Sequence, residues 1–374
     1  MEKLYIVFDQ LPPSSGGGLV ATYVRLADLL KNDYDIEIIS IFDCDNDNKT
    51  QFKNNKINII NKYNLDIRFY KMFKYLKNKQ FKLFFKAIKS SLYYFIKIPS
   101  TRLKIRKLIQ EKDNVIVTCP SAGIFMTKKR KFILEVHIDY KYFFGNNLLG
   151  SMQAKIMRKP TLTLFRSKDS ADHAPKHLNP NYIYNFFDNT NSKRSKKLIK
   201  NKILFFGRFE KQKNPSRLID MAYELKKINK NFVLDMYGTG SLLDETLEKI
   251  KKLKLEDVVH YKGFIDDKNI YNKYSLLWLT SDFEGLALVI IEAKACGIPT
   301  ISTEWGNAVY EEIENNEDGY VTSDNKTFVE YTNKVLTDEK LQKKLSDNAY
   351  KNFKKFSKEN ARKNWIEYLS TYKK

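Results

Sequence analysis

The chain has 374 residues, of which 43% are hydrophobic, and a formal net charge of +22. This length suits two domains of moderate size, and the hydrophobic content excludes a disordered protein. No apolar run reaches the roughly 18–20 residues of a membrane-spanning helix. Three widely spaced cysteines without a CxxC pair, and an N-terminus without a secretory pattern, predict a cytoplasmic protein with free thiols.

The positive charge is concentrated in the first half of the chain. Residues 1–200 carry 37 Lys and Arg against 17 Asp and Glu, a balance of +20, whereas residues 201–374 carry 29 against 27, a balance of +2. From Arg68 to Lys107 there are 13 basic residues and no acidic one. The first half should therefore meet an anionic partner: a membrane face, a nucleic acid or an acidic substrate.

Strand-like and helix-like segments alternate along the chain. Apolar runs typical of strands lie at residues 4–8, 36–42, 115–119, 132–136, 161–165, 203–207, 232–238 and 276–280. Helical periodicity falls between them, as in 215–228, and this alternation predicts parallel sheets with crossover helices. We therefore expect an α/β protein with two doubly wound, Rossmann-like domains that face each other across a cleft. The polar, basic segment 189–202 suggests the boundaries: 1–193, 194–356, and a C-terminal helix of about 357–374 that packs back on the first domain.

A run of three glycines, Gly16, Gly17 and Gly18, follows the first strand-like run and precedes a helical pattern. A glycine turn at the start of a helix lets backbone N–H groups approach a phosphate. The spacing does not match G-x-G-x-x-G or the P-loop. The residues alone therefore leave open which phosphate, if any, this turn would bind.

The second half contains the more specific motifs. In "GRFEKQKNPSRL", Arg208 and Lys213 flank the start of a helix capped near Asn214 or Ser216, with Pro215 in its first turn. Two cations at a strand's carboxyl end, beside a helix N-terminus, suit a diphosphate, although a solvated basic turn would look the same.

Two further segments have the strand, turn and helix pattern. Gly238 and Gly240 in "YGTGS" would either let the backbone come close to a ligand or simply let the chain turn tightly. In "EGLALVIIEAKACGIP", Glu284 and Gly285 precede a helix of about 286–295, in which Glu292 lies among apolar residues. A carboxylate in such a position needs a hydrogen-bond donor, such as the hydroxyls of a ribose or a lysine at the edge of the apolar face.

Together these segments resemble the family-4 retaining glycosyltransferases of the GT-B fold. The resemblance rests on Glu284 and Glu292 as an E-x7-E motif, preceded by "GRFEKQKNP", "YGTGS" and "VVHYKGFI" and followed by "ACGIPTIST". It covers most of the chain and is strongest between residues 203 and 319. The segment "EWGNAVYEEI" departs from the family's GG-x-x-E spacing, so Glu311 and Glu312 receive no role.

The resemblance implies a role for each matched residue. Arg208 and Lys213 would clamp the donor diphosphate, Glu284 would hold hydroxyls of the donor sugar, and Glu292 would bind the ribose. The remaining donor-binding positions are the glycine loop Gly16, Gly17 and Gly18, which would reach across the cleft, the turn glycine Gly238, the nucleobase pocket at Gly263 and Phe264, and the amides of Gly285, Leu286, Ala287 and Leu288. The catalytic set would be His137, Arg208, Lys213 and Glu284, with His137 near the sugar and the leaving phosphate.

The resemblance implies a metal-independent enzyme without a cofactor, which transfers a hexosyl group from a UDP-sugar to a glycan, glycolipid or cell-wall polymer. The segment "DCD" (43–45) resembles a metal-binding D-x-D, but it stands in an Asn-rich acidic loop typical of solvated surface. The alternative function is nucleic-acid binding by the basic half, against which no RRM, KH or helix-turn-helix signature is found. A phosphorylase would need a pyridoxal lysine motif that is not seen.

The basic run also predicts a surface for an anionic membrane or acceptor. Lysines alternate with aromatic residues at helical spacing, a pattern that suits an interfacial helix on the inner face of the plasma membrane. Two ordinary domain helices with solvated lysines, or a helix that meets a polyanionic acceptor, would give the same pattern. The lysines expected to face the membrane or acceptor are Lys74, Lys77, Lys82 and Lys86.

Overall fold

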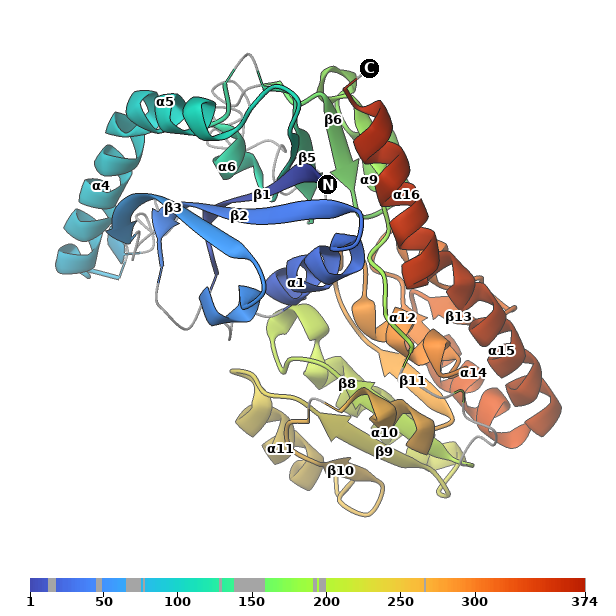
Figure 1. Ribbon diagram of the computed structural model, residues 1–374. Coiled ribbons are helices and arrows are strands. Elements are labelled where there is room, and N and C mark those ends of the chain that lie inside the picture. Colours follow the sequence, from blue (N-terminus) through green and yellow to red (C-terminus); the bar gives the residue numbers. More distant parts are fainter. Residues whose placement is uncertain are drawn as a thin grey trace. The chain divides into compact units, whose positions relative to one another are not determined.

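The computed structural model describes residues 1–374 except 13–17, 45–48, 65–74, 77, 128–129, 138–158, 191–193, 195–199, 266 and 374. The chain divides into two compact units, each built around its own parallel sheet (Figure 1). The first unit comprises Met1–Arg166, Ser170–Ile183 and Asn364–Lys374, and the second comprises Ser167–Asp169 and Tyr184–Lys363. The predicted α/β class with two doubly wound sheets is confirmed.

The sheet of the first unit has seven strands in the order β3-β2-β1-β4-β5-β6-β7, all paired in parallel. Its strands are β1 (Glu2–Gln10), β2 (Tyr34–Asp43), β3 (Lys56–Asn64), β4 (Asn114–Val117), β5 (Ile133–Val136), β6 (Leu162–Phe165) and β7 (Pro180–Tyr182). Its helices are α1 (Gly18–Leu30), α4 (Phe81–Ile96), α5 (Ile98–Leu108) and α6 (Pro120–Gly123), with α9 (Lys168–His173) and the short 3-10 turns η2 (Thr50–Phe52) and η4 (Lys176–Leu178).

The inner strand β1 separates two hydrophobic cores. Leu4, Ile6 and Phe8 pack on one face with α1, whereas Tyr5 and Val7 pack on the other with α5 and α6. This alternation follows from the two-residue period of a strand, and all five side chains are buried. A parallel sheet covered on both faces therefore needs the continuous apolar runs seen in the sequence.

The C-terminal helix α16 (Lys358–Thr371) begins among residues of the second unit and ends among those of the first. Trp365, Leu369 and Tyr372 are buried in the core that contains Leu4 and Ile6. The Tyr372 hydroxyl also accepts a hydrogen bond from the Val115 N–H at 3.1 Å. The end of the chain is thus part of the first unit's core.

The sheet of the second unit has six parallel strands in the order β10-β9-β8-β11-β12-β13. They are β8 (Lys202–Phe206), β9 (Val233–Tyr237), β10 (Val259–Tyr261), β11 (Leu276–Leu279), β12 (Thr300–Thr303) and β13 (Gly319–Thr322). The helices are α10 (Pro215–Ile228), α11 (Leu243–Lys252), α12 (Leu288–Ala295), α13 (Val309–Glu312), α14 (Asn325–Thr337) and α15 (Glu339–Asn352), with 3-10 turns η5 (Lys211–Lys213), η6 (Lys268–Lys273) and η7 (Phe353–Phe356). Among the described residues, none of the helices combines the length and apolar character needed to span a bilayer.

The chain enters the second unit at Tyr184, before the boundary of 193/194 suggested by the polar segment. The reason is apolar packing: Phe187 is buried with Leu286 and Ile291. Its N–H also donates to the Phe356 carbonyl at 3.1 Å. Composition indicated where the chain becomes polar, whereas these contacts decide to which unit it belongs.

Ionisable side chains are buried in helix α12 and beside it. Lys294 forms an ion pair with Asp318 at 2.5 Å, and both side chains are buried. Glu312 is completely buried, and its Oε2 accepts the N–H of Ala287, the residue before α12, at 2.8 Å. Burial raises the pKa of Glu312 well above its ordinary value of 4.5. The start of α12 is therefore tied to a carboxyl group that the fold keeps preferentially protonated.

We expect the stability of the protein to fall with rising pH because of Glu312. Because the pKa of Glu312 is raised in the folded state, its contribution to the free energy of unfolding is fully present below the ordinary pKa. That contribution is lost as the pH rises through the folded-state pKa, by up to about 1.4 kcal/mol per pH unit. Glu312→Gln keeps an oxygen acceptor for the Ala287 N–H and cannot ionise. Thermal unfolding between about pH 5 and pH 8 should show a smaller loss of stability in this variant than in the wild type. The exposed Glu330→Gln is the control, and equal pH dependence in all three proteins would contradict the prediction.

Candidate functional site

The turn after β8 brings two cations to the carboxyl end of that strand. Gly207 and Arg208 follow β8, and Lys213 ends the 3-10 turn before helix α10. Asn214 lies in the left-handed region (φ 45°) and caps the helix, because its side chain accepts the N–H of Arg217 at 3.1 Å. The sequence prediction of a helix capped near Asn214, with Pro215 in its first turn, is confirmed.

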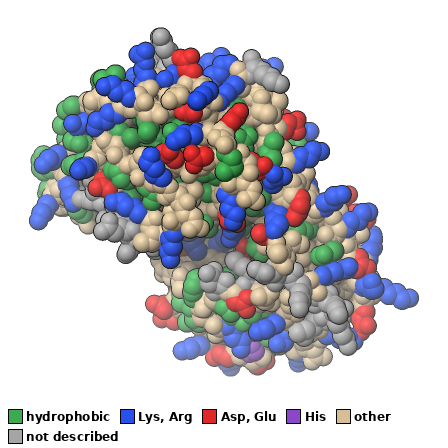
Figure 2. Space-filling model, viewed as in Figure 1, with side chains coloured by type: hydrophobic (Ala, Val, Ile, Leu, Met, Phe, Trp, Pro, Cys, Tyr) green, Lys and Arg blue, Asp and Glu red, His purple; other side chains and the backbone are tan. Residues whose placement is uncertain are grey.

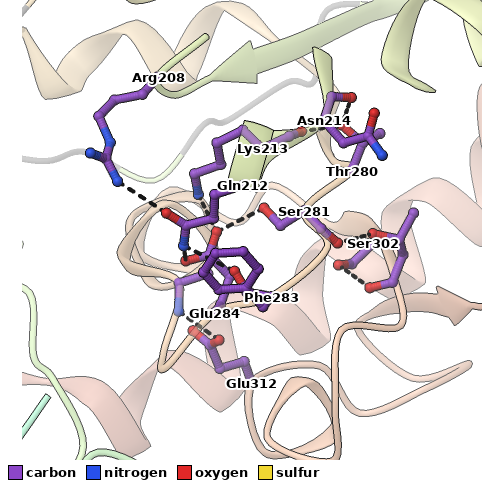
Figure 3. Close-up of polar contacts among 12 residues, drawn as sticks. Arg208, Gln212, Lys213, Asn214, Thr280, Ser281, Phe283, Glu284, Ser302 and Glu312 are labelled. Carbon is purple, nitrogen blue, oxygen red and sulfur yellow. Dashed lines mark hydrogen bonds and ion pairs between the residues drawn. The ribbon is translucent and has the colours of Figure 1, made fainter. Parts of the chain in front are cut away.

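The buried Lys213 forms an ion pair with Glu284, which lies in the loop after β11. The Lys213 Nζ is 2.5 Å from Glu284 Oε1, and the Ser281 hydroxyl donates to the same oxygen at 2.7 Å. β8 and β11 are neighbours in the sheet, so their carboxyl ends meet at one edge, where open α/β sheets bind ligands. The structure thus brings together two residues predicted from separate motifs (Figure 3).

Gln212, which we did not predict, connects the exposed Arg208 to this ion pair. Its side-chain oxygen accepts from Arg208 Nη2 at 3.0 Å. Its side-chain nitrogen donates to Glu284 Oε2 at 3.1 Å and to the Phe283 carbonyl at 2.9 Å. An amide can accept from a guanidinium and donate to a carboxylate at once, which neither a lysine nor a glutamate can do. The only sequence signal for this role is an amide side chain in the turn between the two cations.

We call Arg208, Gln212, Lys213 and Glu284 the donor cluster. Its two cations and one carboxylate leave one positive charge in excess, and that charge is carried by the exposed Arg208. In Figure 3 the side chains of Gln212 and Lys213 both point toward Glu284. A guanidinium with unused N–H groups suits the paired oxygens of a phosphate, so the cluster can bind an anionic group.

The glycine turn after β9 packs against the turn that carries Arg208. A Cβ added to Gly238 would lie 1.8 Å from the Gly207 carbonyl oxygen, and one added to Gly240 would lie 2.3 Å from that of Phe209. The two backbones also bond to each other, since Phe209 N–H donates to the Thr239 carbonyl at 2.9 Å. Tight packing of two turns therefore explains both glycines, and the donor-binding role of Gly238 stays a prediction.

Gly263, a predicted nucleobase-pocket residue, lies beside that turn. Its carbonyl accepts from the Gly238 N–H at 2.9 Å, and its φ of +82° is in the left-handed region that favours glycine. The neighbouring Phe264 has an exposed side chain. An exposed ring next to a glycine-rich edge offers a surface for stacking, but no contact of this structure tests the predicted role.

The segment before α12 differs in part from the prediction. The helix begins at Leu288 rather than Leu286, so Gly285, Leu286 and Ala287 precede it in the loop. The Ala287 N–H donates to Glu312, because a buried carboxyl group needs a donor. In this structure the amide is held by Glu312, for which no role was predicted, and its phosphate-facing role stays a prediction.

Glu292 lies in α12 with its side chain buried, as the apolar sequence around it predicted. Its Oε2 accepts a hydrogen bond from the buried Tyr271 hydroxyl at 2.7 Å. A tyrosine therefore supplies a hydrogen-bond donor to this carboxylate, where the sequence had suggested a ribose or a lysine. The ribose-binding role stays a prediction.

His137 directly follows β5 in the first unit and contacts two other side chains. The Tyr23 hydroxyl lies 2.7 Å from its Nε2, and Arg166 Nε donates to its Nδ1 at 3.2 Å. Arg166 in turn is paired with the fully buried Glu135. Burial and the Arg166 charge hold the pKa of His137 well below its ordinary value, so this imidazole is neutral near neutral pH.

The other predicted residues of the first unit are placed only in part. Gly16, Gly17, Lys74 and Lys77 lie outside the described residues, and Gly18 is the first residue of α1. Lys82 and Lys86 are exposed on α4. In the described part of the chain, no group of three or more His, Cys, Asp or Glu side chains could hold a metal ion. Asp43 of the D-x-D segment pairs with Lys49 at 3.0 Å.

The chain is similar in sequence and in fold to known proteins. Residues 187–352 match the family described as glycosyl transferases group 1. The chain is 32% identical over 175 residues to the amylovoran biosynthesis glycosyltransferase AmsD of Erwinia amylovora. The aligned residues are 46% of this chain and 48% of AmsD. The chain thus spans about half the length of that relative.

A second relative is more completely covered. The N-acetylgalactosamine-N,N'-diacetylbacillosaminyl-diphospho-undecaprenol 4-alpha-N-acetylgalactosaminyltransferase of Campylobacter jejuni is 29% identical over 303 residues, which are 74% of this chain and 81% of the relative. Among solved structures, Anabaena HepE in complex with UDP superposes with a TM-score of 0.76 at 16% identity, over 99% of this chain and 100% of HepE. The fold is therefore GT-B, and residues 187–352 are the part of this chain that is similar to the glycosyl transferases group 1 family.

Proposed function

We propose that this protein is a retaining glycosyltransferase that moves a sugar from a UDP-sugar to a hydroxyl of a glycan, glycolipid or cell-wall polymer. The observation that carries the proposal is the donor cluster at the carboxyl ends of β8 and β11, in which Lys213 is paired with Glu284 at 2.5 Å. The E-x7-E motif formed by Glu284 and Glu292 supports assignment to family 4.

The relatives support a sugar-nucleotide donor and a glycan-type acceptor. AmsD is named for amylovoran biosynthesis, the Campylobacter enzyme for transfer to a diphospho-undecaprenol-linked sugar, and the HepE structure contains UDP. Nucleic-acid binding is disfavoured, because residues 201–374, which contain the donor cluster, carry a balance of only +2.

Catalysis would consist mainly of stabilising the negative charge that grows on the leaving diphosphate. The exposed Arg208 and the buried Lys213 would place positive charge beside the diphosphate. Cations and hydrogen-bond donors that are already in position act best where charge develops in the transition state. The acceptor hydroxyl would attack from the face that the diphosphate leaves, so no protein nucleophile is needed. We assign no metal ion and no cofactor to this step.

Glu284 would bind hydroxyls of the donor sugar. A carboxylate has about four acceptor positions, and Lys213, Ser281 and Gln212 use three of those of Glu284. Among the described residues no other group uses the remaining position on Oε2, which could accept a sugar hydroxyl. Glu292 would bind the ribose, and His137, as a neutral imidazole, would hydrogen-bond the donor sugar without carrying charge.

The proposed function is tested by incubating the protein with a panel of UDP-sugars in the absence of acceptor. Slow transfer to water should release one sugar selectively, and early NMR spectra should show the anomeric configuration of the donor retained. Turnover of none of the sugars, or inversion at the anomeric carbon, would refute the proposal. The sugar that reacts would identify the donor.

Charge removal from the donor cluster should slow the reaction rather than only weaken binding. Arg208→Ala and Lys213→Ala should each lower kcat/KM by on the order of 2–4 kcal/mol, with most of the loss in kcat, because the lost contact is strongest in the transition state. Lys211→Ala is the matched control, since Lys211 is an exposed cation in the same turn. Near-wild-type turnover in both cluster variants, or an equal loss in the control, would rule out the assignment.

Activity should be independent of divalent metal ions. Arg208 and Lys213 provide the positive charge that a metal would otherwise supply to the diphosphate. The measurement is turnover after dialysis against EDTA, with and without added manganese or magnesium. Loss of activity that either metal restores would show that the cluster does not suffice.

His137 should not titrate near its ordinary pKa. Because burial and Arg166 lower its pKa, an NMR titration should show the His137 ring neutral down to well below about pH 6.5. Arg166→Gln removes the neighbouring cation and should raise that pKa toward neutrality, whereas Arg166→Lys, which keeps the charge, should not. A wild-type ring that titrates near pH 6.5 would contradict this.

A further inference from the structure

Helix α4 (Phe81–Ile96) of the first unit presents an apolar stripe to solvent. Phe81, Phe85, Leu92 and Ile96 are 55%, 64%, 58% and 71% exposed. At 3.6 residues per turn, these four positions fall within roughly 60° of one another around the helix. They therefore form one continuous face rather than scattered surface residues, and such faces on soluble proteins mark interaction sites.

The opposite face of the same helix is anchored on the protein. Ala87 and Ser90 are buried, and the ring of Tyr94 stacks on Phe42 at a centroid distance of 5.5 Å. The Tyr94 hydroxyl also donates to the Ser121 carbonyl at 2.8 Å. The helix thus already has its core-facing side, so the exposed stripe is a second apolar face that the described residues of the first unit leave uncovered.

Lysines line one flank of the stripe. Lys82, Lys86 and Lys89 are exposed and lie within roughly 60° of one another, next to the apolar positions. The segment from Arg68 to Lys107, which includes these lysines, contains 13 basic residues and no acidic one. Figure 2 shows hydrophobic and basic side chains intermixed at the end of the first unit where Figure 1 places α4.

We propose that this face of α4 docks on an anionic lipid bilayer. The apolar stripe would enter the boundary between headgroups and acyl chains, and the flanking lysines would contact lipid phosphates, which is the arrangement of an interfacial helix. A polyanionic polymer would match the lysines but give the phenyl rings no apolar surroundings. This inference goes beyond the proposed transfer reaction and does not depend on the donor cluster.

The two parts of the face make different contributions, which separate variants can measure. Lys82, Lys86 and Lys89 changed together to Gln should weaken binding to anionic vesicles by on the order of a hundredfold, an effect that high salt should imitate. Phe81, Phe85 and Ile96 changed together to Ser should abolish binding at every salt concentration. All six side chains are exposed, so neither variant should unfold.

The experiment is co-sedimentation of the full chain with vesicles of phosphatidylcholine alone and of phosphatidylcholine mixed with phosphatidylglycerol. Controls in the second unit are Lys230, Lys251 and Lys252 changed together to Gln, and Ile228→Ser, all at exposed positions. We expect binding only to the anionic vesicles, lost in the α4 variants and kept in the controls. UDP binding, measured in parallel, should be the same in every variant, so its absence would count against the proposed function alone.

Three outcomes would overturn the docking proposal. The first is that the wild type does not bind anionic vesicles, and the second is that the α4 variants bind them as well as the controls do. The third is that the stripe instead mediates self-association that persists without lipid. Equal binding of wild type and the Phe81, Phe85 and Ile96 variant to a soluble polyphosphate, without binding to vesicles, would assign the lysines to a polymer.

Discussion

The ion pair between Lys213 and Glu284 is the contact on which the arrangement of the donor cluster depends. It joins the turn after β8 to the loop after β11 and is almost completely withdrawn from water. Burial of two charges costs their hydration energy. The attraction between the charges offsets that cost only if further hydrogen bonds satisfy the remaining lone pairs and N–H groups. Ser281 and Gln212 do so for the carboxylate, which explains why both side chains converge on it.

The local backbone is shaped to deliver Lys213 to that position. Asn214 adopts a left-handed conformation that turns the chain from the 3-10 turn into α10, and its side chain donates to Asp282 at 2.9 Å, two residues before Glu284. On the other side, the glycines after β9 let their turn pack directly on Gly207 and Phe209. The turn that carries Arg208 and Lys213 is therefore held from two directions, so the positions of its cations are set before any ligand binds.

Much of this could be predicted from sequence, because strands, turns and helix starts are indicated by residues close together in the chain. Arg208, Lys213 and Glu284 each follow a recognisable strand, and the carboxyl ends of neighbouring parallel strands must meet. Gln212 and Glu312 could not be predicted, since their roles depend on partners in other elements: a carboxylate in the next strand's loop and the N–H of Ala287. The unit boundary shifted for the same reason, because Phe187 is assigned by its packing rather than by the polar residues after it.

Helix α12 shows how buried charge can specify one arrangement in an otherwise apolar element. Its eight residues include two charged side chains, Glu292 and Lys294, and both are buried. Each has a partner on a different element: Tyr271 on η6 for Glu292, and Asp318, just before β13, for Lys294. Apolar packing alone would tolerate a slip or rotation of so uniform a helix, whereas any such movement would leave a buried charge unpaired. These two polar contacts, together with the Glu312 contact that holds the Ala287 N–H, therefore favour one rotation and one axial position of α12.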